Sequence, residues 1–426
     1  MARLLEYQGK RWLEKAGLPV PQGREASSPE EARQIAEELG RPVAVKAQVQ
    51  AGGRGKSGAV KLVDTPQEAE EAARSILNME IKGYPVRCVL VEEKLDIVRE
   101  YYVTCIVNSS REALSPMLMF SVDGGMDIEA VPDKKILRYN FSEREGLPTD
   151  DAADIAERAG IPPEKLSTFA SFLHTLAEAY IKYDCFTLEI NPMVETSDGK
   201  LYAADCKMEV DNSAVFRHPE FGIEVARDFG NEPTELDLIG WNIEKTDLRG
   251  SGFVMNMGYD EESPGYVGYH PIGGGSAMMG MDALNTVGLK PANYADTSGN
   301  PVASKVYRVA KVVLSQPNLD GYLLGGFMMA NQEQWHHAHA VVKVLREELP
   351  KKPGMPCVLL LAGNKEKESL EILHEGLADV EGNSRVEIYG REHVTDTDFI
   401  GNRLLDLAKE YRAEKNAAAG KAGAEQ

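Results

Sequence analysis

The segment from Val43 to Val63 constrains this chain most, because it reads as two short strands joined by a glycine-rich loop. The glycines of the loop are Gly52, Gly53, Gly55 and Gly58. Glycine adopts backbone conformations that other residues resist, so such a loop can come close to a ligand. Three cations accompany the loop: Lys46, Arg54 and Lys56. Cationic side chains neutralise phosphate, and the segment therefore predicts a loop that covers the phosphates of a nucleoside triphosphate.

Better-known glycine motifs fit this segment less well. The spacing Gly53-x-Gly55-x-x-Gly58 has the letters of a dinucleotide fingerprint, but that motif opens a helix, and here the β-branched run 60–63 follows. A P-loop would need glycine at the position of Gln50. A protein kinase would place its lysine after the glycine loop and would carry a His-Arg-Asp motif. A glycine hairpin without a ligand stays open as the plainer alternative, which the nearby cations disfavour.

Composition narrows the classes of function. The chain has 426 residues, 43% of them hydrophobic, which is enough for two or three domains. Its formal net charge of -20 argues against nucleic acid and anionic membranes as partners, because an acidic surface repels them. The five cysteines form no CxxC pair, and no apolar run has the length of a membrane span. We expect a soluble, cytoplasmic protein that binds an anionic small molecule through local cations and helix ends.

The first part of the chain predicts a mixed α/β lobe. Helices are expected over residues 3–17, 29–40, 65–77 and 162–183, and strands over 86–93 and 99–107 beside those at the glycine loop. Ser28 and Pro29 have the residue types that open a helix, and Gly17 and Gly40 those that close one.

A hairpin is expected next, with strands over 186–195 and 201–206. If its pairing is centred near Asp198, then Asn191 and Asp205 lie opposite each other, with Cβ atoms roughly 4.5–5.5 Å apart. Two oxygen ligands suit Mg²⁺, which keeps waters and takes the rest of its shell from phosphates. An ordinary hairpin with a polar, solvated face fits the same spacing.

From about residue 237 strands and helices alternate. Strands are expected over 253–259, 321–324, 357–361 and 386–389, and helices near 276–287, 304–315, 332–349, 366–376 and 395–412. The alternation predicts a parallel, doubly wound sheet, which binds ligands at the carboxyl ends of its strands and on helix amino termini. Three loops suit that role: 273–276, 297–301 and 325–331. The tail over 413–426 is rich in Ala, Gly, Lys and Glu, which predicts disorder.

Two motifs resemble the ATP-grasp signatures of succinyl-CoA synthetase β subunits, which bind the nucleotide in enzymes that form a thioester from a carboxylic acid. One is the sequence from Lys46 to Lys56, and the other is Leu188-Glu189-Ile190-Asn191-Pro192, followed by Asp205 and Lys207. The resemblance covers almost the whole chain. It implies an ATP-grasp domain over residues 1–236, a flavodoxin-like CoA-ligase domain over 237–412 and a disordered tail over 413–426.

This resemblance also implies roles for individual residues. The ATP phosphates would be bound by Lys46, Gly53, Arg54 and Gly55, with Lys46 and Arg54 also catalytic. The adenine would lie beside the connector of Glu92, Glu93 and Leu95, and Glu100 would belong to the same nucleotide site. Asn191 and Asp205 would bind Mg²⁺. Gly274 and Gly275 would receive the phosphate carried as phosphohistidine on an α-type partner subunit, which would also bind most of the coenzyme A.

The loops of the second domain differ from those of the succinate enzymes. Ser298-Gly299-Asn300-Pro301 and the segment from Gly325 to Asn331 look more like the citrate-binding segment of ATP-citrate lyase. With the lyase module missing, the chain looks most like the large subunit of a citryl-CoA synthetase or the matching subunit of a split ATP-citrate lyase. ATP-citrate lyase has an arginine after the strand that here ends at Leu361, and Lys365 is the nearest cation. The expected substrate-binding residues are Gly274, Gly275, Ser298, Gly299, Gly326, Asn331 and Lys365.

The predicted reaction is therefore an ADP-forming ligation of citrate to coenzyme A, with succinate or malate as alternative acids. Phosphoryl transfer would activate a carboxylate that is otherwise a poor acyl donor. Among this chain's own histidines, His270 is nearest to the 273–276 loop, whereas His336, His337 and His339 are expected on a solvated or interface face. Two other classes stay open: a regulatory subunit without catalysis, and an ATP-grasp carboxylase or amide ligase.

Overall fold

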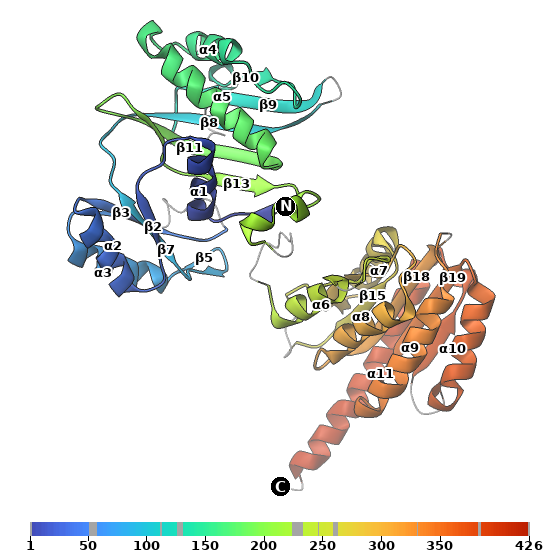
Figure 1. Cartoon of the computed structure of the whole chain (residues 1–426). Coiled ribbons are helices and arrows are strands. Elements are labelled where there is room, and N and C mark those ends of the chain that lie inside the picture. Colours follow the sequence, from blue (N-terminus) through green and yellow to red (C-terminus); the bar gives the residue numbers. More distant parts are fainter. Residues whose placement is uncertain are drawn as a thin grey trace. The chain divides into compact units, whose positions relative to one another are not determined.

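The computed structural model describes residues 2–50, 58–110, 113–125, 131–223, 233–245, 247–258, 263–329, 331–381 and 385–424. The chain divides into two compact units, residues 1–232 and 233–426 (Figure 1). Residues 51–57 of the glycine loop lie outside the described residues, and with them the predicted ligands Gly53, Arg54 and Gly55. Across the described ranges, no helix is long and apolar enough to cross a bilayer.

A small antiparallel sheet in the first unit carries Lys46. Its strands, in spatial order, are β2 (Gly23–Ala26), β7 (Val89–Glu93), β3 (Val43–Ala47) and β4 (Val60–Val63). Helices α2 (Pro29–Leu39) and α3 (Pro66–Leu77) pack on this sheet and on each other. Ser28 and Thr65 cap these helices through their hydroxyls, so the predicted helix starts are confirmed. A short β5 (Glu80–Ile81) and β6 (Tyr84–Pro85) pair beside it.

A larger antiparallel sheet carries the predicted hairpin. Its strand order is β1 (Ala2–Arg3), β13 (Lys207–Val210), β11 (Cys185–Thr196), β8 (Ile97–Ser110), β9 (Ala113–Ser121) and β10 (Leu137–Asn140), and β12 (Leu201–Ala203) pairs with β11. Helices α1 (Glu6–Ala16) and α5 (Leu166–Lys182) contact the sheet, and α4 (Thr149–Arg158) packs on α5. Short 3-10 helices occupy Asp133–Lys135, Pro163–Lys165, Val215–Arg217 and Pro219–Phe221. The core between sheet and helix combines aliphatic and aromatic side chains, and the rings of Tyr101 and Phe169 lie 5.0 Å apart within it.

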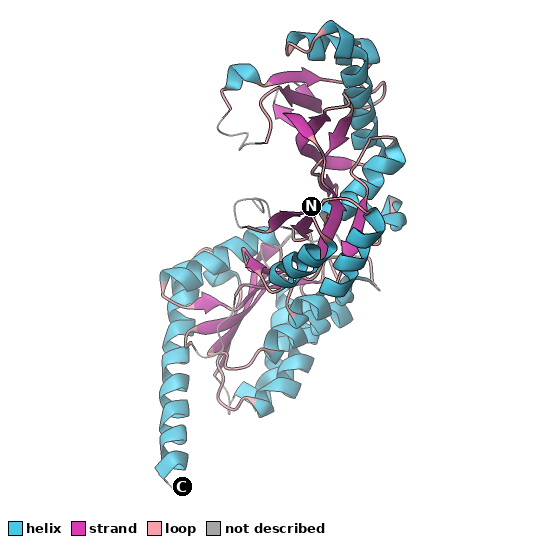
Figure 2. Cartoon of the chain, turned by 90° about the vertical axis from the view of Figure 1, so that its left-hand side faces the viewer, coloured by secondary structure: helices cyan, strands magenta, loops and turns pink. Residues whose placement is uncertain are grey.

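The second unit is a doubly wound sheet with parallel strands. Their spatial order is β16 (Lys290–Pro291), β15 (Tyr266–Pro271), β18 (Gly321–Met329), β19 (Cys357–Gly363) and β20 (Val386–Tyr389). Helices α7 (Gly274–Thr286) and α11 (Thr397–Ala424) pack together, while α8 (Ala303–Ser315), α9 (Trp335–Glu348) and α10 (Glu366–Glu381) form a second layer (Figures 1 and 2). Two 3-10 helices, Leu349–Lys351 and Arg391–His393, complete the unit. This is the flavodoxin-like strand order, with the reversal of order between β15 and β18, and it confirms the predicted fold class.

Three expectations for this unit were wrong. The strand expected over 253–259 is β14 (Phe253–Asn256), which follows α6 (Glu235–Lys245) and pairs antiparallel with β17 (Asn293–Asp296), outside the parallel sheet. The inner strand β15 was missed, because Gly268, His270 and Pro271 weaken its strand signal. The tail that was expected to be disordered is helical as far as Ala424, because alanine has the highest helix propensity.

Candidate functional site

Lys46 lies on β3 with its side chain 14% exposed, and three protein oxygens surround its ammonium. Its Nζ lies 3.1 Å from Glu6 Oε1, 2.6 Å from Glu92 Oε1 and 2.6 Å from the Ala204 carbonyl oxygen. Burial acts to lower the pKa of Lys46, but the charges of Glu6, Glu92 and Asp205 outweigh it and raise that pKa. The ammonium is therefore a permanent positive charge.

Lys10 on α1 binds the same three groups. Its Nζ lies 2.9 Å from Glu6 Oε1, 2.7 Å from Glu92 Oε2 and 2.8 Å from the Ala204 oxygen. Two ammonium groups and two carboxylates thus form one buried, neutral cluster that joins α1, β3 and β7. We call Glu6, Lys10, Lys46 and Glu92 the four-charge cluster. Glu92, predicted at the nucleotide, is buried within it.

Asn191 and Asp205 occupy opposite positions of the hairpin. β11 pairs with β12 as far as Met193 and Ala203, and with β13 again from Glu189 and Lys207. These pairs share one register centred on Asp198, so the predicted centre of the hairpin is confirmed. Inside the interruption the Ala204 N–H donates to the Pro192 carbonyl at 3.2 Å. The register therefore sets the Asn191 and Asp205 positions across from each other, and the charge of Asp205 acts on Lys46.

The donor set at this hairpin fits Mg²⁺. An amide and a carboxylate supply hard oxygen ligands, and Mg²⁺ completes its shell with water and phosphate oxygens. Within the described part of the chain, no three His, Cys, Asp or Glu side chains are grouped as a metal cage. The four-charge cluster is neutral, so Asp205 adds a net negative charge beside it, which a cation would offset.

The loop after β9 contacts β11 and β8 through Gly125. The Gly125 N–H donates to Asn191 Oδ1 at 3.1 Å, and a Cβ on Gly125 would lie 1.6 Å from Glu100 Oε2. Gly125 has φ +71°, which also favours glycine. Glu100 and Asn191 are therefore both contacted by Gly125 of this loop, which the sequence analysis did not assign to the site.

The predicted adenine connector joins β7 to β8. Leu95 lies half-buried in this connector, at residues 94–96. Glu93, at the end of β7, pairs with Arg41 at 2.7 Å and accepts from the Gln22 N–H at 3.0 Å. The structure thus gives Glu93 a local structural role, while Leu95 lies two residues beyond the strand that holds Glu92.

In the second unit, the loop before α7 lies at the carboxyl end of β15. The Gly273 N–H donates to Asp296 Oδ1 at 3.0 Å, and Gly273 has φ +91°. Gly274 and Gly275 are exposed, and a Cβ on either would meet nothing within 4 Å. The amino terminus of α7 therefore borders open space at these two predicted residues.

The predicted loop at Ser298 is joined to α9 by a polar layer. The Ser298 N–H and Oγ both bind the Asp296 carboxylate, at 2.9 and 3.0 Å. The Asn300 N–H donates to Gln332 Oε1 at 3.3 Å, and Asn300 Oδ1 accepts from the Glu333 N–H at 3.2 Å. The carboxyl ends of β15, β17 and β18 thus share one hydrogen-bonded layer. Gly299 belongs to it with φ +74°.

Two histidines beneath this layer are buried and neutral. His270 contacts the Tyr322 hydroxyl at 2.7 Å and Thr297 Oγ1 at 3.0 Å, and His337 Nε2 lies 2.9 Å from the same Thr297 oxygen. Burial lowers the pKa of each to about 3. The expectation that His337 marks a solvated face was wrong, because α9 turns it into the core. His270 likewise has no exposed surface.

The other predicted substrate residues are spread over different environments. Gly326 is buried inside β18, where a Cβ would lie 2.7 Å from the Leu360 carbonyl, so close packing alone accounts for glycine there. Lys365 is exposed, has φ +61° and pairs with Glu368 at 3.0 Å. Asn331 is exposed where the chain leaves β18.

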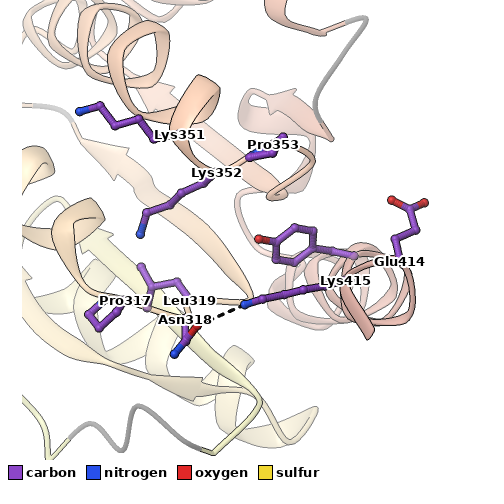
Figure 3. Close-up of a pocket in the computed structure, with 9 residues that line it drawn as sticks. Pro317, Asn318, Leu319, Lys351, Lys352, Pro353, Glu414 and Lys415 are labelled. Atoms are coloured by element: carbon purple, nitrogen blue, oxygen red, sulfur yellow. Dashed lines mark hydrogen bonds between the residues drawn. The ribbon is translucent and has the colours of Figure 1, made fainter. Parts of the chain in front are cut away.

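A separate groove of about 510 Å³ lies at the other edge of the parallel sheet, where β18 and β19 begin (Figure 3). Lys352 and Lys415 line it, but Lys352 Nζ donates to the Gln316 carbonyl at 2.6 Å and Lys415 Nζ to Asn318 Oδ1 at 3.3 Å. Doubly wound sheets bind their ligands at the carboxyl ends of the strands, so this groove is not the candidate site.

Sequence reasoning missed Glu6 and Lys10. The local signal is their spacing of four residues, which sets both on the face of α1 that the structure buries, beside Gly9 and Leu13. Charged residues at positions that a helix buries need partners, and a lysine and a glutamate four residues apart can supply only part of that need.

Comparison with known proteins gives three consistent likenesses. A family model described as an ATP-grasp domain matches residues 3–195. The GDP-forming succinate–CoA ligase subunit beta of Thermus thermophilus is 38% identical over 377 residues, which cover 87% of this chain and 93% of that protein. The ADP-forming enzyme's subunit beta from Rubrobacter xylanophilus is 35% identical over 417 residues, covering 96% of this chain and 99% of that protein.

A solved structure shares the fold of both units. It is the ATP citrate lyase of Methanothrix soehngenii in complex with citrate and coenzyme A, with a TM-score of 0.77 and 20% sequence identity. The match covers 95% of this chain and 99% of that one.

Proposed function

The chain belongs to the family of succinate–CoA ligase β subunits, and on that premise we propose that it is the nucleotide-binding subunit of an ADP-forming ligase that joins citrate to coenzyme A. The balanced reaction is citrate + CoA + ATP giving citryl-CoA + ADP + phosphate. The four-charge cluster beside Asp205 carries the nucleotide part of the proposal. It holds a permanently charged ammonium next to a carboxylate and amide pair in the unit that the ATP-grasp model matches.

Lys46 would neutralise a nucleotide phosphate. Its three ammonium donors are occupied by Glu6, Glu92 and the Ala204 carbonyl, so a phosphate oxygen would replace one of these acceptors. Lys10 would then hold the two carboxylates in place, because it binds both of them independently of Lys46. Gly53, Arg54 and Gly55 would close over the same phosphates.

Asn191 and Asp205 would hold Mg²⁺, and Glu100 would belong to the nucleotide site through the Gly125 loop. A bound Mg²⁺ supplies positive charge that offsets the charge on the phosphates. The adenine would lie at the connector of Glu93 and Leu95, next to Glu92.

Citrate is the acid we propose for the second unit, because its loops at Ser298 and Gly325 differ from the pattern of succinate enzymes. Gly274, Gly275, Ser298, Gly299, Asn331 and Lys365 would line the acid and phosphate site, with Gly326 keeping the strand close to its neighbour. Succinate is the second candidate, and the names of the relatives favour it.

The chain would work with an α-type subunit that carries the phosphohistidine and binds most of the coenzyme A. The buried, neutral state of His270 supports this, because a phosphate acceptor must reach solvent or a ligand. We further propose that the complex acts in the cytoplasm, where the five free cysteines would stay reduced. The isolated chain would bind MgATP but complete no turnover.

The test is reconstitution with the α-type subunit of the same organism. Thioester formation would be measured with ATP, Mg²⁺ and CoA, in parallel with citrate, succinate and malate. Citryl-CoA as the main product supports the proposal. Succinyl-CoA or malyl-CoA alone would keep the ligase and overturn the choice of acid, and no thioester from any of the three would contradict the ligase itself.

A further inference from the structure

A buried lysine fixes the loop before β14. Lys305 of α8 is fully buried, and its Nζ donates to the backbone carbonyls of Asp247, Arg249 and Gly250. The Asp247 carboxylate lies 3.8 Å from the same Nζ. Burying an ammonium is costly unless it is fully hydrogen-bonded, so three carbonyls of one short loop are a strong constraint on that loop.

The same loop is joined to the predicted substrate loop. The Ser251 N–H donates to the Ser298 carbonyl at 2.7 Å, and a Cβ on Gly250 would lie 2.7 Å from both the Ser298 oxygen and the Pro301 nitrogen. Gly250 has φ +67°, so its conformation also requires glycine. The backbone of Arg249 is therefore held beside Ser298 and Pro301.

The guanidinium of Arg249 is anchored at one edge. Its Nε donates to the Asn300 carbonyl at 2.8 Å. Among the described residues, no carboxylate forms an ion pair with its two Nη groups. Arg249 is also exposed, so these groups are accessible to a ligand. An arginine held through Nε presents its two Nη groups together, which is one of the geometries that bind a carboxylate through two parallel hydrogen bonds.

Neighbouring groups place this guanidinium at the polar layer. The Asn300 carbonyl oxygen accepts from Arg249, and its Oδ1 accepts from the Glu333 N–H, two residues before α9. His336 follows on α9, and its pKa is lowered by burial first and then by the positive charge of Arg249. Arg249 therefore lies where the ends of β17 and β18 meet.

We infer that Arg249 binds a carboxylate of the acid substrate and thereby sets the acid specificity of the second unit. This inference rests on the proposed function, because it takes the polar layer at Ser298 and Asn300 as the acid site. Arg249 would supply a guanidinium on the β14 side of that site, whereas the turn after β19 supplies Lys365. The acid would carry at least two carboxylates, since one must stay free for thioester formation while another binds Arg249.

The test measures acid binding directly, apart from catalysis. Citrate, succinate and malate would be titrated into the full chain by calorimetry, and KM for the acid, ATP and CoA would be measured in the reconstituted complex. The variants are Arg249→Ala and Arg249→Lys, because lysine keeps the charge but not the paired hydrogen bonds. Arg346→Ala is the matched control, an exposed arginine on α9 whose partner is Asp379 at 2.9 Å.

We expect Arg249→Ala to weaken acid binding and raise the KM for the acid roughly 10- to 100-fold, with Arg249→Lys recovering only part. The KM for ATP, and every parameter of Arg346→Ala, should stay within about twofold. Unchanged acid binding in Arg249→Ala, or no binding of any of the three acids to the unmutated chain, would overturn the inference. A complex that makes thioester normally with Arg249→Ala would leave the ligase proposal intact and refute only the role of Arg249.

Discussion

Lys46 Nζ lies 2.6 Å from the carbonyl oxygen of Ala204, which ties the small sheet of the first unit to the hairpin that carries Asp205. Lys10 Nζ donates to the same oxygen at 2.8 Å. Because Ala204 immediately precedes Asp205, the position of the proposed metal ligand depends on two lysines from α1 and β3. The groups proposed to bind the phosphate and the metal are therefore joined through one backbone oxygen.

The first prediction concerns the charge of Lys46. Lys46→Met removes a permanent cation and leaves Glu6 and Glu92 with Lys10 alone, so the local charge becomes negative and opposes phosphate. MgATP affinity, measured by calorimetry on the full chain, should fall roughly 10- to 100-fold. Lys200→Met is the control, because Lys200 is an exposed lysine of the hairpin turn that pairs with Asp198. Equal losses in both variants would contradict a specific role for Lys46.

The second prediction separates stability from nucleotide binding. Lys10→Met leaves the buried Glu6 and Glu92 with one cation, and breaking a buried ion cluster in this way costs about 3–5 kcal/mol of unfolding free energy. Adding Glu6→Gln restores neutrality, so the double variant should be more stable than Lys10→Met in urea unfolding. If Glu6→Gln destabilises the Lys10→Met background as much as it does the unmutated chain, the cluster is not coupled.

The sequence predicted much of the fold because its signals were local. Ser28 capped its helix as expected, and the turn at Asp198 defined the register that brings Asn191 opposite Asp205. These features depend on residues within a few positions of each other. The doubly wound unit was likewise recognisable from its alternation of strands and helices.

The misses depended on long-range packing. Glu6 and Lys10 join Glu92 across more than eighty residues, and no local pattern reveals that a lysine on α1 will share an acceptor with Lys46. His337 was expected at a surface, but Thr297 and Gln332 supply its polar contacts in the core. The strand β15 was hidden because buried His270 finds its partner on β18, a contact that strand propensity does not report.

A third prediction concerns the metal. Asp205→Asn keeps an oxygen donor but removes its charge, so the Mg²⁺ concentration for half-maximal activity of the reconstituted complex should rise on the order of tenfold. The affinity for metal-free ATP should not fall in this variant, because a negative charge near the phosphates is lost. Asp198→Asn, in the turn of the same hairpin, is the control. An unchanged Mg²⁺ requirement in Asp205→Asn would rule out this residue as a metal ligand.

The last prediction concerns pH and the two buried histidines. Burial lowers the pKa of His270 and of His337 to about 3, below the usual value near 6.5 in an unfolded chain. Between these values the unfolded state binds more protons, so the stability that neutral histidines provide is complete above pH 6.5 and is lost as the pH falls. Each histidine then contributes a slope of up to about 1.4 kcal/mol per pH unit.

Urea unfolding of the full chain between pH 7 and 5 should show that loss of unfolding free energy. His337→Gln should reduce the slope of this free energy against pH, whereas His339→Gln on the exposed side of α9 should not. A slope that His337→Gln leaves unchanged would mean that His337 takes up a proton in the folded chain.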